Sequence, residues 1–366
     1  MKNLFYTFLI SSLSIATYAA IDTGTGADGS CNWAGPTIAS GTYNCTDLTI
    51  SGAVQVTGTT ALIVKVQGDV TINNSLTLSG QDGSAGGAGV AGGYNGGAGS
   101  TNGSGPSAGT FGNAGGDVTA GAFGNDGAGG GSGGSHGTLG SVGIAGTDSG
   151  DGGPGAAGIA PTSTYDSATL FTTTMTGGSG GGGGGMDDNS TVGAQGGGGG
   201  GILRISAGGT VLIASSINAS GGAGNSASND AGGGGGGAGG AIFIETNDHI
   251  TITGSITASG GAAGPGAGNG GAGGAGGNGI IRLDDSDGAV TGVGLVTPTP
   301  SVFQSDVSLS SQTSELNAFT SDISPGCALR EVHDDFKFGF IFLGFLFLVS
   351  NLLLNFNQRQ EVEVRR

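Results

Sequence analysis

Three of the few basic residues in this sequence share one repeated position with a phenylalanine. Each of these four residues is the centre of a short apolar triplet, and the four are Lys65, Arg204, Phe243 and Arg282. If neighbours such as Leu203 and Ile205 face a core, the central residues face outward and stack into a ladder. The pattern predicts either a basic stripe that holds an anionic glycan or carboxylate, with Phe243 as a stacking surface, or cations that pair with acids such as Glu245 and Asp284.

Acidic clusters are the second group with recognisable chemistry. One is Asp187-Asp188, and the other consists of Asp284, Asp285 and Asp287. Carboxylates and loop carbonyls are calcium ligands, so Ca²⁺ is the one cofactor for which the sequence offers ligands. Neither cluster has the spacing of an EF-hand or of the nonapeptide calcium repeat. Solvated acids in turns are therefore the alternative interpretation.

The sequence shows no recognisable set of catalytic residues. His136 and His249 are isolated, and His333 adjoins an apolar segment. Polysaccharide lyases and hydrolases need convergent carboxylates with a base or nucleophile. The glycine runs are not phosphate loops, because no Gly-Lys-Ser/Thr follows them. We therefore expect a protein that is not an enzyme and has no other cofactor, with a β-helix polysaccharide lyase or hydrolase as an alternative.

Composition narrows the class of partner. The chain has 366 residues with a formal net charge of −17, and 88 residues are glycine. This charge argues against nucleic acids and anionic lipids as partners. Eight prolines without a Gly-X-Y register exclude collagen. Several Val/Ile/Leu strand patterns argue against a wholly disordered chain.

Short strands recur at fixed spacings. Strand patterns at 48–50 and 54–56 return at 70–72 and 76–78, which is a 22-residue spacing. The pattern at 211–213 returns at 250–252 with a 39-residue spacing, and a weaker copy with the same spacing aligns Leu295 with Ile256. Short strands that cannot bury an apolar face alone form a core by stacking. The spacings predict an all-β fold, a parallel β-helix or β-solenoid.

Three glycine runs begin after the same Ser-Gly corner of the repeat. They span Gly80–Gly201, Gly221–Gly240 and Gly260–Gly279. The sequence predicts that they are loops inserted into the solenoid. The largest of them, Gly80–Gly201, is the first candidate for a segment that binds a ligand or partner. Their partial period of three favours packed polyproline-II helices, which have three residues per turn. Flexible coil is the alternative, because glycine loses the most entropy on ordering.

The two ends of the sequence have the patterns of targeting signals. Residues 1–20 have the charge, apolar run and small residues of a secretory signal peptide. Export makes a disulfide between Cys31 and Cys45 the simplest state of these cysteines. Residues 338–354 are almost wholly apolar and are followed by arginines, which predicts one transmembrane helix with a cytoplasmic tail.

Two resemblances follow from these residues. The ending, with Gly326-Cys327, an apolar span and a terminal arginine pair, resembles MYXO-CTERM-type sorting signals of Gram-negative surface proteins. This resemblance implies a membrane anchor, on the periplasmic side or at the cell surface, and makes Cys327 a residue for processing. The glycine run before 202–205 and the Ser-Ile-x-Ala-Ser-Gly-Gly at 216–222 and 255–261 resemble glycine-rich parallel β-helix adhesins of bacteria.

The expected organisation has six parts. They are a signal peptide (1–20), N-terminal solenoid coils (21–82), a glycine-rich insertion (83–201), coils with the 39-residue repeat (202–296), a Ser/Thr/Pro linker (297–326) and the anchor (327–366). The expected function is a non-catalytic surface adhesin or envelope structural protein that contacts extracellular glycans or other surface proteins. A surface module that binds ice through residues such as Thr251, or that binds calcium, is the alternative.

Overall fold

The computed structural model describes residues 21–116, 126–147, 153–168, 175–187, 191–286 and 290–304. The expected signal peptide, most of the linker, Cys327 and the apolar segment 338–354 lie outside these residues. Within them, no helix is long and apolar enough to cross a membrane.

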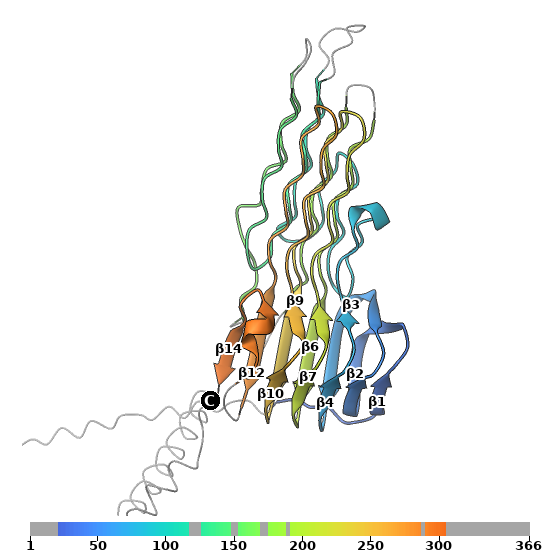
Figure 1. Ribbon diagram of the computed structural model, residues 1–366, viewed down its shortest axis with the longest axis vertical. Helices are drawn as coiled ribbons and strands as arrows, with labels where there is room; N and C mark the ends of the chain where they lie inside the picture. The colour runs from blue at the N-terminus through green and yellow to red at the C-terminus, as the bar shows by residue number, and fades with distance from the viewer. Residues whose placement is uncertain are drawn as a thin grey trace, which may run out of the picture. The chain divides into compact units, whose positions relative to one another are not determined.

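The described part of the chain is all-β and its strands pair in parallel (Figure 1). The strands are β1 (Gly29–Trp33), β2 (Thr37–Ile50), β3 (Val54–Val66), β4 (Val70–Ile72), β5 (Leu76–Thr77), β6 (Ile202–Ala207), β7 (Val211–Ile213), β8 (Ser216–Asn218), β9 (Ala241–Thr246), β10 (Ile250–Ile252), β11 (Ser255–Thr257), β12 (Ile280–Asp285), β13 (Val296–Thr297) and β14 (Ser301–Gln304). Two short 3₁₀ helices, η1 (Gly83–Ala85) and η3 (Val293–Leu295), interrupt the connections.

The strand pairs form three rows. The first row begins with β1, which pairs with the end of β2, and continues through β4, β7 and β10. The second row begins with the start of β2, which pairs with the start of β3, and continues through β5, β8, β11 and β13. The third row pairs β2 with the end of β3 and continues through β6, β9, β12 and β14.

The register of these rows matches the spacings in the sequence, with one exception. Leu48 pairs with Val70, and Val211 pairs with Ile250, as the 22- and 39-residue spacings predict. The expected position of Leu295 is wrong, because Ile256 pairs with Val296 instead. The turn of η3 displaces the chain by one position, so Val296 is buried and Leu295 is exposed.

One apolar core lies behind the three rows. Alternate residues of each strand point into it, which is why the strand sequences alternate with period two. Its members include Leu48, Val64, Ile205, Ile244 and Leu283, each at most 1% exposed. The disulfide between Cys31 and Cys45 joins β1 to β2 at the beginning of this core.

The glycine-rich segments run side by side beyond the strands (Figure 1). Between two neighbouring segments, backbone hydrogen bonds recur at every third residue. Gly197 and Gly200 donate to the carbonyls of Gly235 and Ala238, and Gly233 donates to Gly271. We call this assembly the glycine bundle. The three Ser-Gly corners are themselves stacked, because Gly80 donates to Ser220 and Gly221 to Ser259.

Many buried positions of the bundle have room only for glycine. A Cβ atom built on Gly235 would lie 2.0 Å from the carbonyl oxygen of Ser132, and one on Gly199 would lie 1.7 Å from that of Gly178. Neighbouring backbones therefore touch where side chains would otherwise separate them. The runs keep glycine because the segments pack backbone to backbone.

Candidate functional site

The outward face of β6, β9 and β12 carries three of the four residues of the predicted ladder. Lys65 is not among them. Arg204 pairs with Phe243, and Phe243 pairs with Arg282. The Cζ atoms of Arg204 and Arg282 lie 5.1 and 4.9 Å from the centre of the Phe243 ring. Arg282 also lies 4.2 Å from the ring centre of Phe303. These distances are typical of cation–π contacts.

Lys65 does not belong to this ladder, so that part of the prediction is wrong. Arg204 pairs with Ile63, and Lys65 pairs with Ser206 further along β6. The long insertion between β3 and β6 hides the register, because the 39-residue spacing does not extend across it. Lys65 instead forms an exposed ion pair with Asp22, with 2.5 Å between Nζ and Oδ2.

Both arginines of the ladder are paired with local acids. Arg204 donates two hydrogen bonds to Glu245, the shorter at 2.7 Å. Arg282 donates to both oxygens of Asp284 at 2.7 and 2.5 Å, and to the carbonyl of Ala168 at 2.7 Å. Burial raises the pKa of Asp284 even though Arg282 opposes this effect. The ladder is therefore a set of local ion pairs, the second of the two interpretations, and no open basic stripe is present in the described residues.

The ladder faces the returning end of the glycine-rich insertion. Phe243 is fully buried, and Ile202, Ala241 and Met175 pack around it. Because Ala168 and Met175 belong to the insertion, Arg282 and Phe243 hold that segment against the strands.

A buried polar cluster around His136 was not predicted from the sequence. The ring of His136 is fully buried, with Nδ1 2.7 Å from the carbonyl oxygen of Gly239 and Nε2 3.5 Å from Oδ2 of Asp166. Tyr165 stacks on the ring at 4.7 Å, and its hydroxyl donates to Gly177. The interpretation of His136 as isolated is wrong, because residues far along the chain supply its partners. The buried ring cannot meet a substrate, so the cluster fastens segments of the bundle.

Environment shifts the pKa of two members of this cluster. Burial raises the pKa of the Tyr165 hydroxyl above its usual range. Burial also acts to raise the pKa of Asp166, but the nearby His136 and the hydrogen bonds from Thr176 outweigh it, and the pKa falls below the usual value. Thr176 supplies both its backbone N–H and its hydroxyl to Asp166.

The acidic clusters do not form metal centres in the described residues. Asp284 faces Arg282, whereas Asp285 is turned away from it, accepts from the N–H of Ile250 and lies 3.4 Å from His249. Asp187 is buried, and one of its oxygens accepts from the N–H of Thr191. Asp188 and Asp287 lie outside the described residues. Within those residues, no three His, Cys, Asp or Glu side chains could hold a metal ion together.

Exposed apolar side chains gather on the glycine-rich insertion. Six of the nine large exposed apolar residues of the described chain lie there, although it consists mostly of small residues. Five of them lie on three adjoining segments and form what we call the apolar patch, namely Phe111, Leu139, Val142, Ile144 and Ile159. Gly143 donates to the carbonyl of Gly158, so the segments that carry Val142 and Ile159 are neighbours. Thr110 donates to the carbonyl of Ile159, which adds the segment of Phe111.

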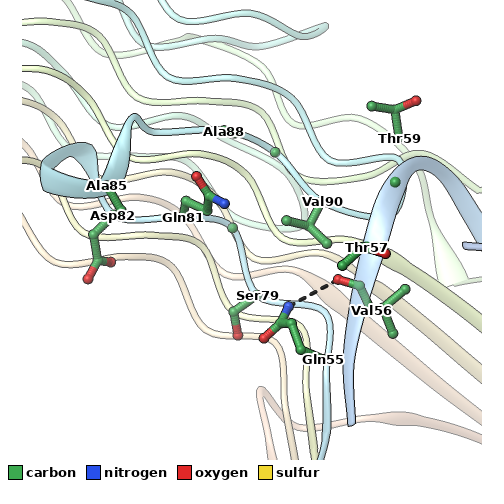
Figure 2. A pocket seen from close by; sticks show the side chains of 13 residues that line it. Gln55, Val56, Thr57, Thr59, Ser79, Gln81, Asp82, Ala85, Ala88 and Val90 are labelled. Atoms are coloured by element: carbon green, nitrogen blue, oxygen red, sulfur yellow. Dashed lines mark hydrogen bonds between the residues drawn. The ribbon is translucent and has the colours of Figure 1, made fainter. Parts of the chain in front are cut away.

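A groove lies where the first glycine run leaves the strands (Figure 2). Its volume is about 660 Å³. One side consists of β3 residues from Gln55 to Thr59, and the other of residues from Ser79 to Asp82. Ala85 and Ala88 supply apolar surface along the groove. The sequence directed attention to this run as a whole but contained no signal for the groove.

No family model, curated protein or solved structure matches the chain. Functional inference therefore depends on the geometry of these surfaces.

Proposed function

We propose that this chain is a non-catalytic adhesin of the cell surface and that the apolar patch is its contact surface. The observation that carries the proposal is the concentration of exposed Val, Ile, Leu and Phe side chains on the glycine-rich insertion. Contiguous apolar surface on a soluble domain commonly marks a site of interaction. The occupant we infer is an apolar surface of another extracellular protein, because aliphatic side chains dominate the patch and bases are absent from it.

The scaffold behind the patch is, in this proposal, a parallel β-solenoid. Three rows of parallel strands, whose pairs keep the 22- and 39-residue spacings of the sequence, support that architecture. For the glycine bundle we infer polyproline-II helices, supported by hydrogen bonds that recur at every third residue. Such a bundle has a fixed surface, so its apolar side chains can bind with little loss of entropy.

The proposed cellular location follows from the two ends of the sequence. Residues 1–20 direct export, and residues 338–354 anchor the chain in the membrane of a Gram-negative bacterium, with Cys327 as the processing residue. The disulfide within the first two strands suits an oxidising compartment. The body would then face the cell exterior or the periplasm.

The test is adhesion by cells that display the full-length chain. In one variant Val142, Ile144 and Ile159 are changed to Ser, all within the patch. The matched control changes Val293, Leu295 and Val302 to Ser, which are exposed apolar residues near the end of the described chain. We expect the patch variant to lose most attachment to other cells and the control to retain it. Equal attachment by both variants, displayed at equal levels, would exclude the patch as the contact surface.

The ice-binding alternative receives less support from the positions of its threonines. Thr251 lies in β10 of the first row, whereas Thr257 lies in β11 of the second row. In the first row, Leu212 stands between Thr71 and Thr251. The threonines therefore do not form one regular array, and we expect no thermal hysteresis.

A further inference from the structure

We propose that the groove in Figure 2 binds a neutral oligosaccharide. This site is separate from the apolar patch and goes beyond the proposed adhesin function. The groove has a volume of about 660 Å³, within the range of about 300 to 1,000 Å³ usual for small-molecule sites. It is therefore large enough to take up a short segment of a glycan chain.

The lining of the groove matches the hydroxyl groups of a sugar. Gln55, Gln81, Thr57 and Thr59 line it with amides and hydroxyls, and Ser79 lies at its wall (Figure 2). The Thr59 hydroxyl and the Gln81 amide can both donate and accept hydrogen bonds, as a sugar hydroxyl can. The Thr57 hydroxyl donates to the carbonyl of Ile38, so it is available to a ligand as an acceptor. Asp82 adds one carboxylate, which only accepts when it is ionised. The apolar surface of Ala85 and Ala88 suits the C–H face of a sugar ring.

Charge excludes the anionic sugars from this site. None of the lining residues is Lys, Arg or His, so a carboxylate or sulfate group would have no countercharge in the groove. Asp82 and the formal net charge of −17 would both repel such a ligand. The class of ligand is therefore an uncharged saccharide.

Ser79 supplies an independent indication of a ligand. Its Oγ atom is buried and has no hydrogen-bond partner among the described residues. A buried hydroxyl without a partner costs free energy, and such groups in native proteins call for an explanation. Rotation of the Ser79 side chain toward the groove would bring this buried hydroxyl within reach of a ligand hydroxyl, which would be the missing partner.

Both walls of the groove are held in place before any ligand arrives. The carbonyl of Gly58 in β3 accepts from the N–H of Ala91 at 2.8 Å. On the other wall, Gln81 donates from its N–H to Ala88 and accepts at its carbonyl from Gly198. Oδ1 of Asp82 accepts from the N–H of Ala223 at 2.7 Å. Little ordering remains to oppose binding, which favours affinity.

The test measures binding of hexasaccharides to the full-length chain by calorimetry. The probes are uncharged hexamers of glucose, galactose and mannose, with a hexamer of galacturonic acid as the anionic comparison. We expect saturable binding of at least one uncharged hexamer and no binding of the anionic one. Failure of every uncharged hexamer to bind, or equal binding of the galacturonic acid hexamer, would overturn the proposal.

Variants then locate the site. Changing Thr59 and Gln81 together to Ala is expected to weaken binding at least about tenfold, or about 1.4 kcal/mol. The matched control changes Thr42 and Gln67 to Ala, because both lie outside the groove. Ser79→Ala is expected to weaken binding while the melting temperature stays equal or rises, because an unpaired buried hydroxyl is removed. Unchanged affinity in both groove variants would place the saccharide elsewhere and overturn the assignment.

The result is separable from the test of the adhesin proposal. Thr59, Ser79 and Gln81 do not belong to the apolar patch, so their variants leave it intact. Loss of saccharide binding with retained cell attachment would support the groove and the patch as two sites.

Discussion

At the scale of single residues, His136 and Asp166 are polar side chains that hold the glycine bundle together. His136 lies between the carbonyl of Gly239 and the carboxylate of Asp166, and Tyr165 covers its ring. Glycine segments have almost no side chains with which to fix their neighbours. The few polar side chains that are buried among them therefore set how the segments align.

The ionisation of Asp166 makes a predicted contribution to acid stability. Its folded-state pKa is lowered, so the stabilisation is fully present above the usual Asp pKa of about 3.9 and is lost as the pH falls through the lowered value. We expect Asp166→Asn to be less stable near pH 7 and to lose less stability than the wild type on acidification below about pH 4. Melting temperatures measured across this range check the difference. Parallel curves for the two proteins would refute the assignment.

Arg282 is predicted to matter more for stability than Arg204. The side chain of Arg282 is 7% exposed and that of Arg204 is 29% exposed, while the partner acids Asp284 and Glu245 are both largely buried. Removing one partner of a buried ion pair costs about 3–5 kcal/mol, because the other charge stays buried. Arg282→Met also leaves the carbonyl of Ala168 without its donor, so it should lower the free energy of unfolding by about 3 kcal/mol or more. Arg204→Met should cost less, because Glu245 keeps the hydrogen bond from the Ser206 hydroxyl. Urea denaturation of both variants measures the two losses, and similar losses would contradict this ranking.

The sequence identified most residues of the ladder, but it did not identify all of the residues that contact one another. Alternation correctly placed Arg204, Phe243 and Arg282 on one outward face. Lys65 was misplaced because a long insertion separates its strand from β6 and conceals an offset in the pairing. The partners of His136 were missed because no local pattern connects residues 136 and 166.

The glycine segments are the elements with the least tolerance for side chains. A Cβ atom on Gly235 would lie 2.0 Å from a backbone oxygen, whereas one on Gly153 would have nothing within 4 Å. We expect Gly235→Ala to destabilise the protein by about 3 kcal/mol, near the upper end for overpacking. Gly153→Ala, in another glycine-rich segment, is the control and should cost little. Thermal melts compare them, and equal stability of the two variants would argue against close backbone packing at Gly235.

The strands were predictable at the element scale because their signal is local. Short Val- and Ile-rich triplets define β4, β7 and β10. The 39-residue spacing predicts that β7 pairs with β10, and the shared pattern predicts that β4 pairs with β7 across the insertion. The arrangement of the glycine segments was not predictable in the same way. Many registers of a glycine run are equivalent in sequence, and only the hydrogen bonds between distant runs select one.

The whole molecule combines two ways of building a core. The strands bury Val, Leu and Ile side chains, while the bundle buries glycine backbone and polar atoms that are hydrogen-bonded to one another. Hydrogen bonds must replace apolar burial in the bundle, because a buried backbone group without a partner is costly. This arrangement leaves the larger side chains of the insertion free to face outward, as Val142 and Ile159 do.

The central claim is that the glycine-rich insertion is an ordered platform rather than flexible coil. Hydrogen exchange of its backbone amides tests this claim most directly, because exchange reports whether each N–H is held in a hydrogen bond. We predict that the amides of Gly131, Gly181 and Gly235, each bonded to another segment of the bundle, exchange as slowly as those of β6 and β9. Exchange at the rate of an unstructured chain at these glycines, while the strand amides stay protected, would contradict the account.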